Sequence, residues 1–375
     1  MKFRTERDGL LEALTTASRA ATIRGAGASG SPTVFLRLAG QRLEITGSDP
    51  DLVIESEIEV AGESDGATSV PARLVVDIVR SFEPGAIGFV ADDDEVRITS
   101  GHAEFQIRVQ RGAELVRLGV LDGQGIELPA ELVGEALRQV VRAALTDDSR
   151  APQLTGVLMI ATDNGIRLVA TDGYRLAYRD LAGVSALPPG ERVLVPARAL
   201  TEVQRLVGTG GTDGAGVKLV FRHSDLDAAF DVGDVRLTTR LIKAAFPEYE
   251  RLIPAEFPNT VKTSREELAT ALRRVRLLVR DSKDATTPVR LSLAADAIEL
   301  TVLTAESGRA VERVDATYSG DDVVVAFNPS YLLEGVEALR SDTVVIEVID
   351  STKPAMVRGD EDDEYRYVLM PVRVS

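Results

Sequence analysis

The sequence predicts an α+β protein built from three tandem copies of one module. The tetrapeptide Val-Pro-Ala-Arg occurs at 70–73 and again at 195–198, 125 residues further along the chain. A helix, alternating strands, a second helix and further strands follow one another around each copy, and once more near the C-terminus. A repeat of this length can bury a core of its own, so we expect each module to be a domain.

The first helix of each module is predicted by apolar residues at helical spacing in segments 3–21, 126–145 and 261–280. The expected buried faces are Leu10, Leu14, Ala17 and Ala21 in the first, Leu132, Ala136, Val140 and Ala144 in the second, and Leu268, Leu272, Val275 and Val279 in the third. Alternation of polar and apolar residues then predicts strand pairs at 42–60, 166–181 and 298–318.

The second helix of each module follows a short strand and starts near a proline. Segments 68–82 and 193–207 carry the repeated tetrapeptide, whereas 323–340 has Phe-Asn-Pro-Ser in its place. Further alternating strands are expected at 96–110, 235–242 and 364–374. The stretches between modules contain turn residues or prolines, which gives predicted domains at 1–122, 123–254 and 255–375.

The composition argues against a disulfide-bonded, secreted or membrane-spanning protein. The 375 residues include no cysteine, which excludes disulfides and a thiol nucleophile and fits a reducing cytoplasm. The N-terminus lacks a secretory pattern, and no run of about 18 apolar residues predicts a membrane span. We therefore expect a cytoplasmic protein with no membrane partner.

The charge is distributed unevenly along the chain. A formal net charge of −16 argues against a protein that binds nucleic acid tightly by bulk electrostatics. The six helical segments nevertheless carry a net +5, so the remaining residues carry −21. Helices gathered on one surface would make it positive and suited to meeting phosphates, although arginines that merely keep helices soluble would give the same excess.

Candidate catalytic and metal-binding motifs are weak. The stretch 25–30, GAGASG, matches the letters of a dinucleotide-binding loop but follows a helix instead of a strand. His102 and His223 lie in alternating strand segments without metal-ligand spacing. The acidic runs 92–95 and 360–364 lack the pattern of a calcium loop and are expected to be solvated turns. We expect no catalysis, no metal and no cofactor; a metal-dependent enzyme using one acidic run remains the alternative from another class.

The stretch 170–178, ATDGYRLAY, has two interpretations. It is either a plain hairpin with its turn at Asp172-Gly173, or a hairpin whose Tyr174, Arg175 and Leu176 line a groove between modules.

Motifs in all three modules resemble one family, the bacterial sliding clamps, which are the beta subunits of DNA polymerase III. The motifs are MKF at the start, TSVPAR (68–73), VATDGYRLA (169–177), FPEYERLIP (246–254), FNPSYLLEGVEAL (327–339) and YVLMPVRV (367–374). The resemblance implies a DNA clamp fold, with two helices per domain packed on antiparallel sheets. It also implies a head-to-tail homodimer ring that encircles double-stranded DNA without sequence preference and gives the replicative polymerase its processivity. A repeat scaffold that never encircles DNA is the closest rival.

The resemblance also assigns three groups of residues. A pocket for short peptide motifs of the polymerase, the clamp loader and repair factors would use Leu154, Thr171, Gly173, Tyr174, Arg175, Leu176, Pro247, Arg251, Leu252, Asn328, Tyr331, Met370, Pro371, Val372 and Arg373. By position in the resemblance, Arg24, Arg73 and Arg150 would face DNA, and helix location adds Arg80, Arg198, Arg205, Arg276 and Arg280. The subunit contact would pair Phe105 and Ile107 with Leu277 and Leu278 of the other chain.

Overall fold

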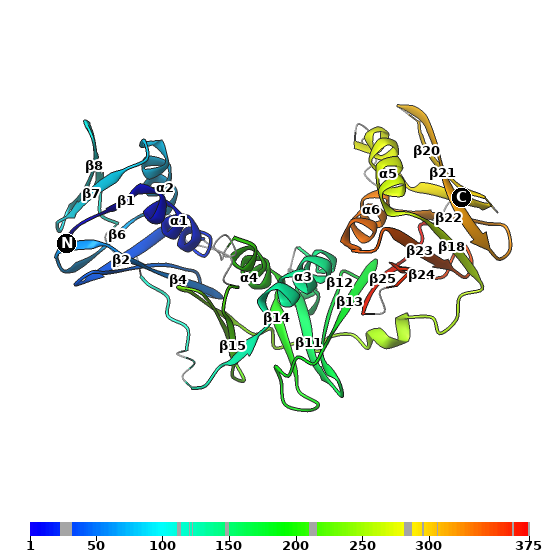
Figure 1. Cartoon of the computed structure of the whole chain (residues 1–375), viewed down its shortest axis with the longest axis horizontal. Coiled ribbons are helices and arrows are strands. Elements are labelled where there is room, and N and C mark those ends of the chain that lie inside the picture. The colour runs from blue at the N-terminus through cyan, green and yellow to red at the C-terminus, as the bar shows by residue number, and fades with distance from the viewer. Residues whose placement is uncertain are drawn as a thin grey trace. The chain divides into compact units, whose positions relative to one another are not determined.

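The computed structural model describes residues 1–22, 32–110, 114–119, 121, 123–146, 150–209, 216–280, 287–294, 296–305, 307–361 and 364–373. The helices of these ranges are α1 (Arg7–Ser18), α2 (Ala72–Ser81), α3 (Ala130–Val140), α4 (Ala197–Thr209), α5 (Arg265–Arg280) and α6 (Pro329–Ala338). Each falls on one of the six predicted helical segments, although α4 runs two residues past 193–207, so the repeated helix pattern is confirmed (Figure 1). The predicted residue Arg24 and the stretch 25–30 lie outside the described residues.

The first of two compact units comprises residues 1–131 and 205–241. Its strands are β1 (Lys2–Glu6), β2 (Thr33–Ala39), β3 (Arg42–Ser48), β4 (Leu52–Glu59), β5 (Ala61–Ser64), β6 (Gly66–Pro71), β7 (Ala86–Ala91), β8 (Glu95–Ser100), β9 (Ala103–Arg108), β10 (Ile126–Leu128), β15 (Leu219–His223), β16 (Asp227–Val232) and β17 (Val235–Arg240). They form two antiparallel sheets, ordered β5-β1-β7-β8-β9 and β10-β15-β16-β17-β4-β3-β2-β6. Helices α1 and α2 pack side by side, and their apolar faces meet Phe3, which stacks on Phe89 at 4.8 Å between ring centroids.

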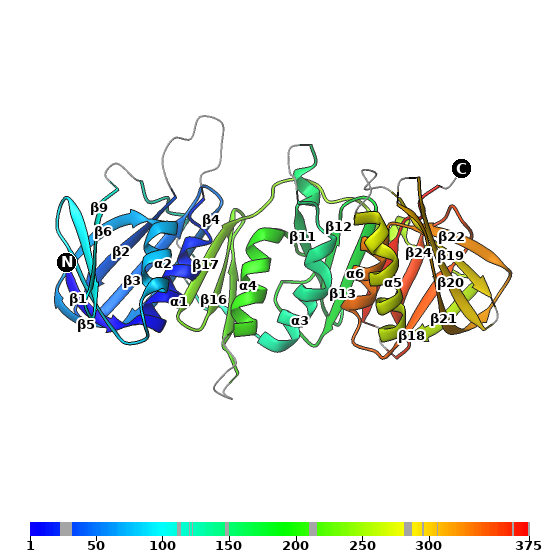
Figure 2. The ribbon, with the colours of Figure 1, turned by 90° about the horizontal axis from the view of Figure 1, so that it is seen from above.

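The second unit comprises residues 132–204 and 242–375. Its strands are β11 (Gly156–Thr162), β12 (Gly165–Thr171), β13 (Arg175–Ala182), β14 (Arg192–Pro196), β18 (Asn259–Ser264), β19 (Val289–Ala294), β20 (Ala297–Thr304), β21 (Gly308–Ser319), β22 (Val323–Phe327), β23 (Thr343–Val348), β24 (Ala355–Gly359) and β25 (Tyr365–Leu369). They join in the order β14-β11-β12-β13-β25-β24-β23-β18-β21-β20-β19-β22. Three short 3-10 turns, η1 (Val141–Ala143), η2 (Pro152–Leu154) and η3 (Tyr249–Leu252), complete the unit. Helices α5 and α6 pack against each other beside these strands (Figure 2).

Strand ladders cross both stretches that separate the predicted modules. Strand β17 of the central module pairs with β4 of the first, and β13 of the central module pairs with β25 of the third. The compact units therefore do not follow the repeat, because the central module shares a sheet with each neighbour.

The predicted buried faces are largely confirmed. The named positions of α1 and α5 are buried, as are Ala136 and Val140. Ala21 and Ala144 are buried too, but they lie beyond the ends of α1 and α3. Leu132 is only half-buried because α3 turns Val133 and Leu137 inward. His102 lies in the turn between β8 and β9, not in a strand, and His223 ends β15 with its ring stacked on Phe221. None of the described helices is both long enough and apolar enough to span a membrane.

Candidate functional site

The turn between β12 and β13 is held by its own side chains. Asp172 Oδ1 accepts hydrogen bonds from the backbone N–H groups of Tyr174 (2.9 Å) and Arg175 (3.0 Å). Thr171 Oγ1 donates to the Arg175 carbonyl at 2.6 Å, and Gly173 has a φ of 89°, which other residues rarely adopt. The predicted hairpin is confirmed, and its turn leaves the Tyr174 side chain 67% exposed.

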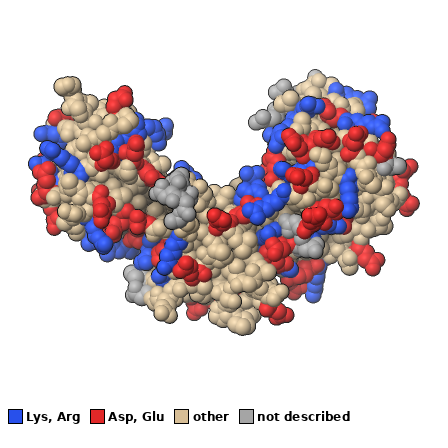
Figure 3. All heavy atoms as spheres, viewed as in Figure 1, with Lys and Arg blue, Asp and Glu red and all other residues tan. Residues whose placement is uncertain are grey.

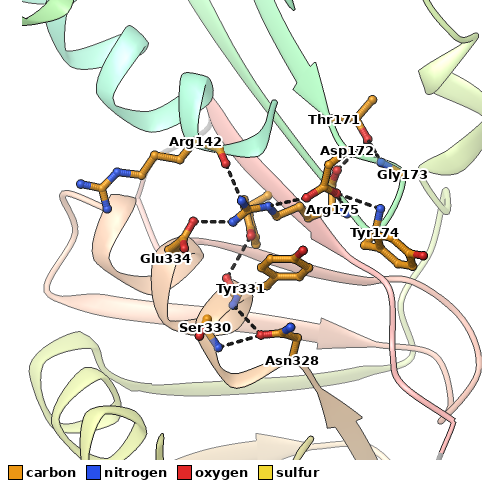
Figure 4. A network of polar contacts seen from close by, with 11 residues as sticks. Arg142, Thr171, Asp172, Gly173, Tyr174, Arg175, Asn328, Ser330, Tyr331 and Glu334 are labelled. Atoms are coloured by element: carbon orange, nitrogen blue, oxygen red, sulfur yellow. Dashed lines mark hydrogen bonds and ion pairs between the residues drawn. The ribbon is translucent and has the colours of Figure 1, made fainter. Parts of the chain in front are cut away.

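The Arg175 guanidinium is enclosed by partners from three elements (Figure 4). Its Nε donates to Asp172 Oδ2 at 3.0 Å, one Nη pairs with Glu334 of α6, and the other donates to the Arg142 carbonyl of η1 at 2.5 Å. The Tyr331 ring lies 4.2 Å from the guanidinium carbon, a cation–π geometry. Burial alone would lower the pKa of Arg175, but the surrounding Tyr367 and Glu334 raise it, so the side chain is charged at all physiological pH.

Helix α6 begins with a side-chain cap beside this arginine. Asn328 Oδ1 accepts from the N–H groups of Ser330 (2.9 Å) and Tyr331 (3.2 Å), which would otherwise lack intrahelical partners. The Tyr367 hydroxyl of β25 donates to the Tyr331 carbonyl at 2.9 Å. Gly335 makes this approach possible, because a Cβ there would lie 2.5 Å from the Tyr367 ring.

The C-terminal segment connects the hairpin turn to the start of α6. Leu369 of β25 pairs with Arg175 of β13, and the next N–H, from Met370, donates to the Tyr174 carbonyl at 2.9 Å. Val372 N–H then donates to the Ala326 carbonyl at 2.7 Å, at the end of β22. The exposed side chains of Tyr174 and Met370 thus lie on adjacent segments, where β13 begins and β25 ends.

The opposite face of β13 carries an apolar cluster. Leu176 points away from Arg175 because side chains alternate along a strand. It packs in a cluster with Val368, Met356 and Tyr249, against which Phe246 and Ile253 also pack. Segment 246–253 therefore lies over this face, and it leaves Pro247 and Leu252 exposed.

The predicted peptide-binding residues thus divide between two faces of one sheet. Arg175, Asn328 and Tyr331 lie on the helix face, whereas Leu176 lies on the face covered by segment 246–253. Thr171 is buried in the hairpin, Pro371 is half-buried and Arg373 is exposed. Arg251 forms an exposed ion pair with Glu248, and Leu154 ends η2, where its carbonyl accepts from Leu145. Whether these residues bind a peptide stays a prediction.

The sequence did not identify four groups that contribute to the polar contacts around Arg175. Asp172 was interpreted only as a turn residue, and Tyr367 and Glu334 only as parts of a strand and a helix. Glu334 lies three residues after Tyr331 and so on the same helix face, which is a detectable spacing. The Arg142 carbonyl carries no side-chain signal at all.

The predicted DNA-facing arginines differ in their surroundings. Arg73, 95% exposed, and Arg80 both pair with Asp77 of the same helix, at 3.7 and 3.1 Å. Arg150 is exposed, Arg198, Arg205 and Arg276 are half-buried, and Arg280 is the last residue of α5. On the face seen in Figure 3 acidic and basic side chains are interspersed.

Both halves of the predicted subunit contact lie near strand edges that no strand of the described residues pairs with. Strand β9 ends the first sheet, and Phe105 on it is exposed with its ring edge-on to Phe82 at 5.6 Å. Ile107 is only 8% exposed, so Phe105 supplies most of the apolar surface there. Leu277 is exposed and Leu278 half-buried on α5, which packs on β21. The ladders described for β21 pair its residues 308–315 on one side only, with β20.

The acidic runs form no metal site among the residues that the structure describes. Asp92 Oδ1 accepts from the N–H groups of Asp94 (2.9 Å) and Glu95 (2.8 Å), which lower the pKa of Asp92 and mark 92–95 as a turn. Within the described ranges, no three His, Cys, Asp or Glu side chains are grouped so that they could hold a metal ion.

Comparison with known proteins gives a match along the whole chain. Residues 1–118, 127–248 and 250–373 match the models of the N-terminal, central and C-terminal domains of the DNA polymerase III beta subunit. The beta sliding clamps of Streptomyces coelicolor and Vibrio cholerae are 31% and 29% identical, each alignment covering 100% of both chains. The structure of the Streptococcus pyogenes beta subunit matches with a TM-score of 0.85 at 25% identity, and that from Thermotoga maritima with 0.85 at 23%, again over 100% of both chains.

Proposed function

The chain belongs to the family of bacterial DNA polymerase III beta subunits and is a sliding clamp of DNA replication; we propose that it acts as a head-to-tail dimer closing a ring around duplex DNA. The match of all three domains in order carries this proposal. Clamping by topology needs no tight grip on DNA, so a net charge of −16 is compatible with it. The protein would conduct no catalysis of its own and would work in the cytoplasm.

Encirclement is tested with DNA topology. The clamp, loaded on nicked circular DNA, should be retained during gel filtration and lost once the circle is cut, because a ring slides off free ends. Equal retention on circular and linear DNA would instead support a scaffold that binds without encircling.

We further propose that the subunit contact joins strand β9 of one chain to the β21 edge and α5 of the other. Unpaired strand edges favour such pairing, and a heterologous contact of this kind closes a ring when its rotation allows. Replacing Leu277 and Leu278 together by Asp would bury two unpaired charges, so light scattering should give the mass of a monomer. Leu226→Asp, at an exposed leucine of the β15–β16 turn, is the control and should remain dimeric. A dimer mass for the double variant would refute the assignment.

The peptide pocket is proposed beside the start of β13 and the end of β25, where Tyr174, Leu252 and Met370 are exposed. Solvent-exposed aromatic and apolar side chains beside a buried cluster favour a hydrophobic-aromatic peptide anchor from the polymerase, the clamp loader or repair factors. Deleting Met370–Ser375 removes the hydrogen bonds to Tyr174 and Ala326 and should abolish binding of a fluorescent peptide carrying a Leu-Phe pair. The dimer mass should not change. Unaltered peptide affinity would exclude this location.

A further inference from the structure

We propose that Arg175 is a positioning residue of the peptide pocket and does not contact the peptide through its guanidinium. This inference rests on the proposed pocket and identifies the buried interactions that give the pocket its shape. Arg175 would act by fixing α6 and the Asp172–Tyr174 turn against each other, so that Tyr174 and Tyr331 have one arrangement before a peptide arrives.

The guanidinium of Arg175 is already engaged by partners within the protein. Its three nitrogens are directed at Asp172, Glu334 and the Arg142 carbonyl, and Tyr331 covers one face of the planar group (Figure 4). The Arg175 side chain is only 9% exposed. A peptide carboxylate that displaced Asp172, whose side chain is 6% exposed, would leave a buried carboxylate of the protein without its arginine.

The partners of Arg175 belong to separate parts of the chain. Asp172 belongs to the hairpin turn and Arg142 to η1, both in the central module, whereas Glu334 and Tyr331 belong to α6 of the third. A planar group with fixed donor directions sets the orientation of all of them at once. Arg175 therefore joins the two modules at the point where the pocket is proposed.

The C-terminal end of α6 is also held by an arginine of the central module. Arg138 donates to the Glu337 carbonyl at 3.3 Å and to the Ala338 carbonyl at 2.9 Å, and Gln139 donates to the latter at 3.0 Å. These are terminal carbonyls of the helix, and a cation there also complements the helix dipole. Because α3 holds one end, the contacts of Arg175 with Glu334 and Tyr331, together with the Tyr367 hydroxyl, place the other end.

The matched test compares two carboxylates of α6. Glu334 and Glu337 are both 31% exposed and both paired with an arginine, but Glu337 pairs with Arg273 at 2.7 Å instead of Arg175. We expect Glu334→Gln and Arg175→Lys each to weaken binding of the fluorescent Leu-Phe peptide by about tenfold. The combined variant should be no weaker than the worse single variant, and Glu337→Gln should bind as the unaltered protein does.

The charge of the peptide separates positioning from direct contact. Positioning predicts the same loss for a neutral Leu-Phe peptide and for one with an added Asp, because both need the same arranged pocket. A loss in Arg175→Lys that appears only for the acidic peptide, with Glu334→Gln binding normally, would overturn the proposal in favour of a direct ion pair.

Hydrogen exchange of the free protein tests the inference independently of binding. The N–H groups of Tyr174, Ser330 and Tyr331 should exchange faster in Glu334→Gln and Arg175→Lys than in Glu337→Gln. Unchanged exchange in Glu334→Gln would refute positioning, even if Arg175→Lys folds poorly. If the unaltered clamp binds neither peptide, the pocket proposal fails, while the exchange result still decides whether Arg175 holds α6.

Discussion

Helices α2 and α6 are the same helix of the repeat in the first and third modules, yet they use their charges differently. Each has ten residues, starting at Ala72 and at Pro329. The sixth position holds a carboxylate in both. Asp77 pairs with Arg73 and Arg80 of its own helix, whereas Glu334 pairs with Arg175 from another module.

The neighbouring positions extend this contrast. At the seventh position α2 buries Ile78 in the core of its own module, while α6 has Gly335 and admits the Tyr367 ring. At the ninth, Arg80 of α2 faces solvent and Glu337 of α6 pairs with Arg273. The repeat determines where the helix lies, and a few side chains decide whether it presents charge to solvent or fastens two modules together.

The largest effect is expected from giving α6 the side chain of α2. Gly335→Ile must displace the Tyr367 ring, which should reduce the free energy of unfolding by about 3 kcal/mol in chemical denaturation. Gly9→Ala in α1, where a Cβ meets nothing within 4 Å, is the control and should be neutral or stabilising. Full stability of Gly335→Ile would show that α6 does not need this close approach.

The cap of α6 should have the next largest effect. Asn328→Ala removes two accepted hydrogen bonds and should reduce the free energy of unfolding by about 1 kcal/mol, with Asn328→Asp restoring most of it. Glu6, the residue before α1, makes no side-chain cap, so Glu6→Ala should change stability little. If Asn328→Ala and Glu6→Ala lost equal free energies of unfolding, the Asn328 cap would not be what stabilises the start of α6.

Two carboxylates should respond to pH in opposite directions. Burial opposes ionisation of Glu135, but its hydrogen bond with Arg138 and the charge of Arg340 outweigh it and lower the pKa. The stabilisation is therefore present at neutral pH and lost as pH falls below the ordinary value of about 4.3. Burial and the nearby Glu44 raise the pKa of Glu55, against the opposing charges of Arg236 and Arg117, so its ionised form destabilises the fold at neutral pH and protonation relieves this as pH falls.

Substitution by Gln separates these contributions. At pH 7, Glu135→Gln should lower and Glu55→Gln should raise the free energy of unfolding, each by about 0.5 kcal/mol, and both differences should shrink toward pH 4. Denaturation curves at several pH values measure this. Differences of the same sign at pH 7 would contradict the assigned causes.

The smallest effect on stability is expected at Asp77. Asp77→Asn leaves Arg73 and Arg80 without their shared carboxylate on an exposed surface, so stability should change by only a few tenths of a kcal/mol. If α2 faces DNA in the ring, affinity for duplex DNA at low salt should rise by about two- to threefold. Asp296→Asn is the control for a general change in charge. Asp296 is exposed, and its partner Arg313 lies on a strand.

The sequence was sufficient for the parts of the fold that depend on periodicity. Apolar spacing located the six α-helices of the described ranges, and alternation located the hairpin at Asp172-Gly173. It was insufficient where distant segments meet. That β13 pairs with β25, and that Arg175 is enclosed by Glu334 and the Arg142 carbonyl, depend on contacts between segments far apart in the chain, which local patterns do not record.

Non-covalent contacts hold the central and third modules together without the peptide that links them. These contacts are the Arg138 and Arg175 interactions with α6 and the β13–β25 ladder. Lys243, Ala244 and Ala245 are exposed just after β17, so a recognition site for a sequence-specific protease inserted there should be cut. The nicked protein should migrate as one particle on a native gel and separate into two fragments only in detergent, because the severed pieces remain bound through the sheet and helix contacts.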